Sequence, residues 1–292
     1  MGKSREGILK THLVSFIVVN YNGGEYLPRC LSSIETEAFD YECILIDNAS
    51  IDNTREVIGK FSIISIFNDE NKGYPLAINQ GIRKAKGKYI FLLSPTTFLE
   101  KGSVSKMLEE IKPDDIGIVA PMLVDLEGEI IHSIRSIPTP ISFILEGIGA
   151  SKLFQRVKFI KKWKLPYFDY SKSGEVEQPM SCALLIKKEV FKEIGLFDER
   201  FFLYFSDVDF SKRLLGKFKT LYLSTTKVIH KLGGTTALLG PRRIRIRNRD
   251  FVSYLKKHHP ASLIFLGILI IVVGELHYLC SKLIQSLGVG KK

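Results

Sequence analysis

The fold is decided by the stretch Val14-Ser15-Phe16-Ile17-Val18-Val19-Asn20-Tyr21-Asn22, an apolar run that ends abruptly in polar residues. Three similar apolar runs follow it, at Tyr41–Ile46, Ser62–Phe67 and Lys88–Leu93. The segments between these runs carry apolar residues at helical spacing, as from Leu27 to Ile34. Strands that alternate with helices of this length predict an α/β fold with a mostly parallel, doubly wound sheet.

Polar loops follow the predicted strands. They read Asn20-Tyr21-Asn22-Gly23-Gly24, Asp47-Asn48-Ala49-Ser50, Asn71-Lys72-Gly73 and Ser94-Pro95-Thr96-Thr97. Asn, Asp and Gly dominate three of the four loops, and these residues turn the chain and present hydrogen-bonding groups. Because ligands of open parallel sheets bind beyond the carboxyl ends of the strands, the loops predict one binding edge.

These segments resemble family 2 glycosyltransferases of the GT-A fold, especially the rhamnosyltransferase-like group of bacteria and archaea. Further matching segments, in the order that the family shows, lie at 47–54, 71–73, 79–81, 85–87, 195–204, 207–209, 230, 247–249 and 257–258. The resemblance covers most of Val14–His259 and is weakest across roughly 122–178. It implies a GT-A type, Rossmann-like, mostly parallel sheet in a nucleotide-sugar transferase domain at 12–259.

Composition agrees with a large domain that handles anionic groups. A chain of 292 residues with 45% hydrophobic content buries a large core. The formal charge of +11 predicts anionic partners, namely nucleotide diphosphates, lipid phosphates or the membrane surface. No helix-turn-helix, zinc-finger or RNA-binding signature accompanies this charge, so nucleic acid is not an expected partner. The four cysteines lack metal-ligand spacing, and we expect reduced thiols in a cytosolic domain.

The C-terminal part of the chain predicts membrane attachment. Residues 263–273 are all apolar or Gly, and the pattern continues to Cys280 with two interruptions. The stretch 261–280 is just long enough for a bilayer span, which takes about 20 residues, so we expect a transmembrane or interfacial helix rather than a buried core helix. Basic residues precede it in excess, which predicts the cytoplasmic face of the cell membrane. A second basic and apolar stretch, 152–164, fits an interfacial segment and a solvated helix equally well.

Asp47 ends the second predicted strand, where a carboxylate can accept hydrogen bonds from a pyrimidine ring N–H or a ribose hydroxyl. Asp is also common in turns, so a purely local role is the alternative. Asp52 is expected to be such a local residue, which caps the helix through Val57. The resemblance implies donor-binding roles for a larger set: Val19, Asn20, Tyr21, Asp47, Asn48, Asn71, Gly73, Asn79 and Ser94.

Asp207 is the candidate general base. A transfer that inverts the anomeric centre needs a carboxylate to take the proton of the acceptor hydroxyl. Five apolar or aromatic residues, 201–205, precede Asp207, and a desolvated carboxylate gains basicity. Ser206 and Asp209 predict a capping box that opens a helix through Leu215, and Asp209 is also a candidate substrate-binding residue. The resembling family reads Glu-Asp-x-Asp here, so Ser206 replaces a Glu.

The metal site is where the sequence departs from the family. The resemblance implies a divalent cation, Mg²⁺ or Mn²⁺, held by an Asp at the position of Thr96, with His230 as a further metal or diphosphate ligand. A neutral hydroxyl is a poor ligand for these cations, which favour anionic oxygen. Metal dependence therefore stays open, and Thr96 is kept as a substrate-binding candidate. Four basic residues could also supply positive charge for the leaving diphosphate: Lys72, Arg242, Arg243 and Arg245. Of these, Arg243 is the substrate-binding candidate.

Two classes of function follow. The first is an inverting glycosyltransferase that moves a hexosyl or deoxyhexosyl group from a nucleotide-sugar donor to a lipid-linked or cell-surface glycan acceptor. The second is a catalytically impaired, glycosyltransferase-like binding or scaffolding protein, which Thr96 and Ser206 motivate. Retention of Asp47, Asp207, Asp209 and His230 favours the enzyme, because a decayed site is expected to lose these residues as well.

Overall fold

A computed structural model describes residues 13–140, 162–234 and 236–261, together with residues 272, 274–276, 278, 279, 282, 283 and 286. The strands are β1 (Val14–Asn20), β2 (Tyr41–Asp47), β3 (Ile64–Phe67), β4 (Tyr89–Leu93), β5 (Thr97–Leu99), β6 (Ile116–Val124), β7 (Ile134–Arg135), β8 (Gly174–Val176), β9 (Gln178–Pro179), β10 (Ala183–Lys187) and β11 (Lys219–His230). The helices are α1 (Leu27–Glu35), α2 (Thr54–Ile58), α3 (Tyr74–Lys84), α4 (Ser103–Glu110), α7 (Lys188–Ile194), α8 (Ser206–Leu214) and α9 (Arg242–His258), with short 3₁₀ helices η1 (Lys162–Lys164) and η2 (Thr236–Leu239).

The main sheet is mixed and mostly parallel in its first half. Its strand order is β3-β2-β1-β4-β10-β6-β11-β5, and β8 pairs with β11. Strand β1 runs parallel to both β2 and β4, whereas β10 is antiparallel to β4 and β6. All four predicted strands are confirmed as β1 to β4, with ends that differ by one or two residues. Their carboxyl ends therefore meet at one edge, as the polar loops predicted.

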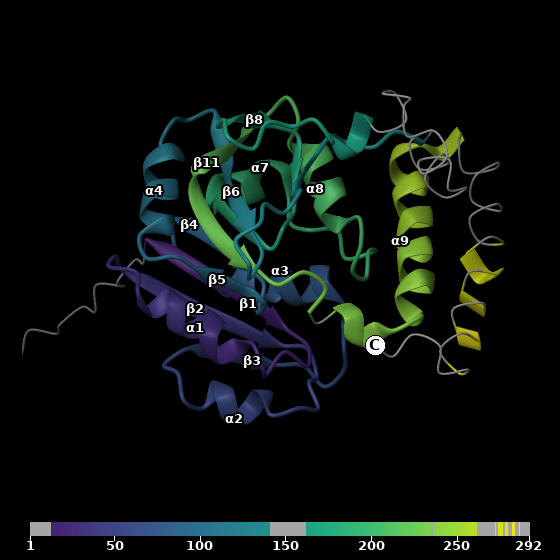
Figure 1. Ribbon diagram of the computed structural model, residues 1–292, viewed down its shortest axis with the longest axis horizontal. Helices are drawn as coiled ribbons and strands as arrows, with labels where there is room; N and C mark the ends of the chain where they lie inside the picture. Colours follow the sequence, from purple (N-terminus) through teal and green to yellow (C-terminus); the bar gives the residue numbers. More distant parts are fainter. Residues whose placement is uncertain are drawn as a thin grey trace, which may run out of the picture.

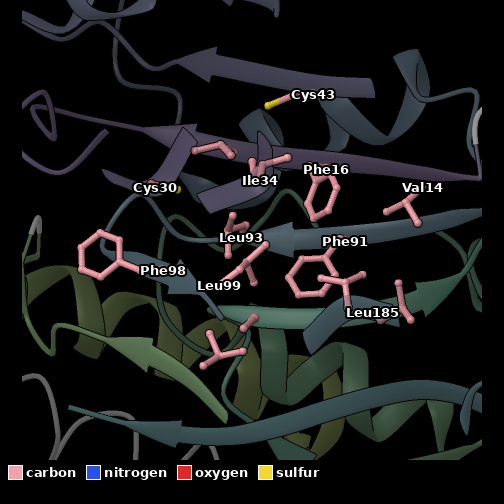
Figure 2. Packing of buried hydrophobic residues seen from close by; sticks show 14 of the residues in the cluster. Val14, Phe16, Cys30, Ile34, Cys43, Phe91, Leu93, Phe98, Leu99 and Leu185 are labelled. Carbon is pink, nitrogen blue, oxygen red and sulfur yellow. The ribbon is translucent and has the colours of Figure 1, made fainter. Parts of the chain in front are cut away.

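Helices cover both faces of this sheet (Figure 1). Side chains alternate along β1, so that Phe16 and Ile17 point to opposite faces. Phe16 belongs to a core cluster that includes apolar residues of α1 and α4, part of which Figure 2 shows. Ile17 packs in a second cluster with residues of α3, α7 and α8. Each fully buried side chain of this size contributes about 1.5–3 kcal/mol, so two continuous cores hold the loops at the sheet edge in place.

The start of α8 differs from the predicted capping box, which is wrong. Phe205 flanks the helix with a left-handed φ of 64°, and no side chain caps the first turn. Ser206 is instead the first helical residue, so its hydroxyl cannot act as the N-cap. At α2 the N-cap is Asn53 rather than Asp52, but Asp52 still bonds the first turn, because its carboxylate oxygens accept from the backbone N–H of Thr54 at 3.1 Å and of Gly24 at 2.9 Å.

The part of the chain that the structure describes contains no helix that is both long and apolar enough to cross a membrane. Much of the helix expected at 261–280 lies outside the described residues, as does most of the stretch 152–164. The described residues from 272 to 286 are helical and lie beside α9 (Figure 1). Arg245 of α9 donates two hydrogen bonds from Nε to the Glu275 carboxylate, at 2.9 and 3.0 Å, and its guanidinium covers the Tyr278 ring.

Candidate active site

A cavity of about 80 Å³ opens at the carboxyl edge of the sheet. Five predicted donor-binding residues line it: Val19, Tyr21, Asn48, Asn71 and Gly73. Tyr74, Phe202, Leu203, Thr236 and Leu239 complete the wall. The structure thus brings together residues from the loops after β1 and β2, the start of α3, the loop before α8, and η2.

A network of amide side chains builds one wall of the cavity. Asn48 Oδ1 accepts from Asn68 Nδ2 at 3.0 Å and from the backbone N–H of Lys72 at 3.1 Å. Asn48 Nδ2 donates to Asn71 Oδ1 at 2.9 Å, and that same oxygen accepts from the N–H of Gly73. Because each amide holds the next in a single orientation, the network fixes the loop at Asn71–Gly73 as a rigid surface.

Gly73 is required by both conformation and space. Its φ of 82° is left-handed, which only glycine adopts without strain. A Cβ at this position would lie 2.6 Å from the carbonyl oxygen of Phe202, and the next residue, Tyr74, donates its N–H to that oxygen at 2.7 Å. The start of α3 and the loop before α8 are therefore joined directly, across 128 positions of sequence.

Three predicted donor residues lie behind the lining rather than in it. Asp47 is 1% exposed and accepts from the N–H of Ser50 at 3.3 Å. Asn20 donates to the hydroxyls of Ser50 and Thr54, while its Oδ1 is buried with no partner among the described residues. Asn79 bonds both the N–H and the carbonyl oxygen of Phe197, which ties α3 to the loop that leads to α8. Direct donor contact by these three remains a prediction.

Asp207 lies beside this cavity, at the start of α8. Its Oδ1 accepts from the N–H of Val208 at 2.9 Å, and its Oδ2 accepts from Gln178 Nε2 at 3.2 Å. Burial raises the pKa of Asp207, and the charge of Arg135, which pairs with Gln178 across β7 and β9, opposes that rise. Burial also raises the pKa of Tyr74, a cavity residue, and the negative charge of Asp207 adds to that effect. Asp207 thus lies near the wall residue Tyr74 without lining the cavity itself, and a carboxylate of raised basicity there has the properties of a general base.

Asp209, two residues later, has a different environment. Its side chain is fully buried, with Arg213 Nε at 2.9 Å, Lys257 Nζ at 2.6 Å and His258 Nε2 at 2.7 Å from its carboxylate oxygens. These partners belong to α8 and α9, so the carboxylate joins the two helices. The structure gives Asp209 a place in this ionic cluster and not on the cavity wall.

Asp250 is a site residue that sequence reasoning missed. It is fully buried on α9, and its carboxylate accepts from the backbone N–H groups of Phe202 at 3.0 Å, Leu203 at 2.8 Å and Tyr204 at 2.9 Å. Two of these three residues line the cavity. The sequence does contain a feature that could have identified it: Asp250 is an isolated acidic residue in a helix that is otherwise rich in arginine and lysine.

Replacing Asp250 with Asn is expected to loosen this loop, because the amide nitrogen would face N–H donors. Loss of charge-assisted hydrogen bonds costs about 1.5–3 kcal/mol each, so nucleotide affinity and stability should fall together. Urea unfolding and nucleotide titration measure both effects. Asp198→Asn is the matched control, because Asp198 also bonds Lys257 of α9 but does not hold this loop. Unchanged nucleotide affinity in the Asp250 variant would contradict the assignment.

The residues around Thr96 do not fit a tight divalent cation. Thr96 is 2% exposed, and its hydroxyl lies 3.1 Å from the Ser94 hydroxyl. His230 Nδ1 lies 2.9 Å from the Thr97 hydroxyl, and burial lowers the pKa of His230 to about 4, so the ring is neutral at pH 7. Within the described part of the chain, no group of three or more His, Cys, Asp or Glu is arranged to hold a metal ion. Hard divalent cations favour anionic oxygen, which this loop lacks.

A pH-dependent loss of stability is expected from His230. Its pKa is lower in the folded chain than the ordinary 6.5, so the unfolded chain binds a proton that the folded chain does not. The free energy of unfolding should therefore fall as the pH decreases from about 6.5 towards 4. His230→Gln should remove this component, as urea unfolding at pH 7 and pH 5 would measure. An identical pH dependence in both chains would contradict the buried neutral ring.

The predicted cations near the diphosphate lie in different places. Lys72 pairs with Asp69 at 3.1 Å, and Arg245 is held by Glu275. Arg243 is exposed on α9 and does not line the cavity, although its charge opposes the burial-raised pKa of Tyr204. The structure thus pairs Lys72 and Arg245 with carboxylates and leaves Arg242 and Arg243 exposed on α9, with Arg243 near the loop before α8.

Comparison with known proteins identifies the family of this chain. The family model described as "Glycosyl transferase family 2" matches residues 15–195. The chain is 26% identical over 277 residues to the N-acetylglucosaminyl-diphospho-decaprenol L-rhamnosyltransferase of Mycobacterium tuberculosis, covering 88% of this chain and 85% of that protein. It is 25% identical to the low-salt glycan biosynthesis hexosyltransferase of Haloferax volcanii, covering 68% and 61% of the two chains.

Solved structures show the same fold at low identity. A mannosyltransferase from Pyrobaculum calidifontis, in complex with GDP-Man and Mn²⁺, aligns with a TM-score of 0.56 at 14% identity, covering 92% of this chain and 74% of that one. TarS 1–349 of S. aureus, in complex with UDP-GlcNAc, aligns with a TM-score of 0.54 at 15% identity, covering 83% and 66%. With its mixed sheet and polar carboxyl edge, this chain has the GT-A fold and belongs to glycosyltransferase family 2.

Proposed function

We propose that this chain is an inverting glycosyltransferase that moves a sugar from a nucleotide-sugar donor to a hydroxyl of a lipid-linked or cell-surface glycan acceptor. The observation that carries the proposal is Asp207, a partly buried carboxylate of raised pKa beside the cavity. It accepts hydrogen bonds from an amide and a backbone N–H and is not held in a salt bridge among the described residues.

The chemical step follows from this placement. The acceptor oxygen attacks the anomeric carbon while Asp207 takes the proton of that hydroxyl. The bond between the anomeric carbon and the diphosphate oxygen breaks, and its electron pair leaves with the nucleoside diphosphate. Attack opposite to the leaving group inverts the anomeric centre, so a single carboxylate is sufficient for the proton transfer.

The acceptor class is supported by charge and by a relative. The mycobacterial relative is named for an acceptor that carries a diphosphate and a polyprenol. This chain has a formal charge of +11, and α9 exposes Arg242, Arg243, Arg247 and Arg249. Guanidinium groups suit phosphate recognition, so an anionic, lipid-linked acceptor fits this surface. The relatives transfer rhamnosyl or hexosyl groups, according to their names, and we propose the same sugar classes here.

Membrane attachment at the cytoplasmic face is also proposed, with support from the described C-terminal residues. Gly274, Glu275 and Tyr278 face α9. Four large apolar residues, spaced by four, three and four positions, are more than half exposed: Val272, Leu276, Leu279 and Leu283. This spacing places them on one side of a helix, as in helices that lie in the membrane interface. An interfacial helix is therefore favoured over a spanning one.

Replacing both Leu276 and Leu279 with Glu should reduce binding to anionic lipid vesicles by about a hundredfold or more, because two apolar side chains of about 1.5–3 kcal/mol each are lost from the interface. Vesicle sedimentation measures this. The control is Leu126→Glu, which changes an exposed apolar residue in the loop after β6. Equal vesicle binding by both variants would contradict attachment through this face.

The deciding experiment for the function is an assay of the full-length chain with a panel of nucleotide sugars: UDP-GlcNAc, GDP-mannose and dTDP-rhamnose. The acceptor is a synthetic lipid diphosphate that carries N-acetylglucosamine, and each reaction is run with and without EDTA. A glycosylated acceptor of inverted anomeric configuration, identified by mass and NMR, is expected. Nucleotide binding without transfer from any donor would instead indicate the impaired binding or scaffolding protein.

A further inference from the structure

The leaving diphosphate needs positive charge close to it, and the residues around Thr96 do not provide that charge. As the C1–O bond breaks, negative charge develops on the diphosphate, and its stabilisation is a major part of catalysis in such transfers. The GT-A neighbours include proteins solved with Mn²⁺, but the set Ser94, Thr96 and His230 contains only neutral groups. Another cation at the same edge must therefore supply this charge.

Lys231 directly follows His230 at the end of β11 and lies next to Thr96. Its backbone N–H donates to the carbonyl oxygen of Thr96 at 2.9 Å. Its ammonium donates to the Tyr26 hydroxyl at 2.9 Å and lies 4.7 Å from the centre of that ring. The Tyr26 hydroxyl raises the pKa of Lys231, so the side chain is charged at neutral pH.

The turn after Lys231 is packed tightly over the same loop. A Cβ on Gly234 would lie 2.5 Å from the Cγ2 of Thr96 and 3.7 Å from the ring of Tyr26. Only glycine permits this approach, so the chain from Lys231 to Gly234 has a fixed position above Thr96. The same segment continues into η2, whose Thr236 and Leu239 line the cavity.

Lys231 is also available to a ligand. No salt bridge between described residues includes it, whereas Lys72 is paired with Asp69 and Arg213 with Asp209. A hydroxyl and an aromatic face orient an ammonium without neutralising its charge. The negative charge of Glu25, which acts on this ammonium, forms no salt bridge with it between described residues, so the ammonium remains able to attract an anionic ligand.

We propose that Lys231 binds the donor diphosphate and takes the place of the divalent cation in the transfer. The inference rests on the proposed glycosyltransferase function. In the step, the C1–O bond to the β-phosphate breaks with its electron pair on the phosphate oxygen, and the Lys231 ammonium donates a hydrogen bond to the diphosphate. The acceptor proton goes to Asp207, so Lys231 gains and loses no proton.

The test compares Lys231→Gln with the unmutated full-length chain, using UDP, GDP and dTDP and the corresponding nucleosides as probes. The affinity for the diphosphate that binds should fall about 10- to 100-fold, because one charge-assisted hydrogen bond is lost. The affinity for the matching nucleoside, measured by competition, should not change. The affinity of the unmutated chain for the diphosphate should be the same in Mn²⁺ and in EDTA.

Two further variants keep the result interpretable. Lys231→Arg retains the charge and should keep diphosphate affinity within about threefold. Lys227→Gln removes an exposed lysine from the same strand and should have no effect. Because Lys231→Arg and Lys231→Gln change the same half-buried position, a folding defect would weaken nucleoside binding in both.

The outcomes separate the two claims. Unchanged diphosphate affinity in Lys231→Gln, or strong Mn²⁺ dependence of the unmutated chain, overturns the role of Lys231 while sugar transfer persists. A chain that binds none of the three nucleoside diphosphates overturns the proposed function together with this inference.

Discussion

Replacing Asp207 with Asn is expected to reduce the rate of sugar transfer by about a hundred- to ten-thousandfold, the usual contribution of a general base. The amide is the same size as the carboxylate, and its one oxygen still accepts from the Val208 N–H, while its nitrogen takes the place of the oxygen that accepts from Gln178. It cannot take a proton from the acceptor hydroxyl. Nucleotide affinity should therefore change little, and kcat should carry the whole loss.

Two measurements decide this prediction. The first is kcat with saturating donor and acceptor, alongside the dissociation constant of the nucleoside diphosphate. The second is the pH profile of the unmutated enzyme. Because burial raises the pKa of Asp207, activity should be lost on acidification at a pH above the ordinary range of an aspartate. Equal losses of stability and nucleotide binding in Asp207→Asn would show a structural role instead.

Replacing Asp209 with Ala should destabilise the fold by about 3–5 kcal/mol, the cost of leaving a buried charged partner unpaired. Arg213, with a side chain only 20% exposed, would lose its carboxylate partner, and Lys257, 21% exposed, would keep only its ion pair with Asp198. His258 would lose the acceptor of its Nε2 hydrogen bond. The contact between α8 and α9, which places Asp250 against the cavity loop, should weaken as a result.

Urea unfolding of Asp209→Ala measures this loss, and Asp207→Asn serves as its matched comparison two residues away. At a temperature where the Asp209 variant is still folded, sugar transfer should persist at a reduced level. Full stability combined with loss of nucleotide binding would support the substrate-binding role that the sequence predicted for Asp209.

Asp207 and Asp209 belong to the same sequence motif, but the motif does not show that the two carboxylates have different roles. Residues two positions apart on a helix point about 200° apart, so Asp207 and Asp209 face different surroundings. A sequence motif lists both as carboxylates. Only the packing of α9 against α8 places Lys257 beside one of them and leaves the other at the cavity.

The capping prediction failed for a comparable reason. Ser206 matched a familiar N-terminal pattern, but Phe205 adopts a left-handed conformation, and the helix starts one residue earlier than the pattern requires. That conformation depends on the loop from Phe202 to Tyr204, which Asp250 holds from a helix more than forty residues away. Capping rules consider only residues that are neighbours in the sequence, so they cannot predict this contact.

The sequence by itself determined the strands β1 to β4, the edge at which their loops meet, and the cavity residues Asn48, Asn71 and Gly73. Those features depend on alternation, spacing and turn chemistry, which are local properties of the chain. The tertiary structure alone decided which charges are free and which are paired. Asp250 reaches the loop before α8, and Lys231 reaches Thr96, through contacts between segments more than forty residues apart. Such contacts follow from how the helices and strands pack, because electrostatic roles depend on distance and burial rather than on order along the chain.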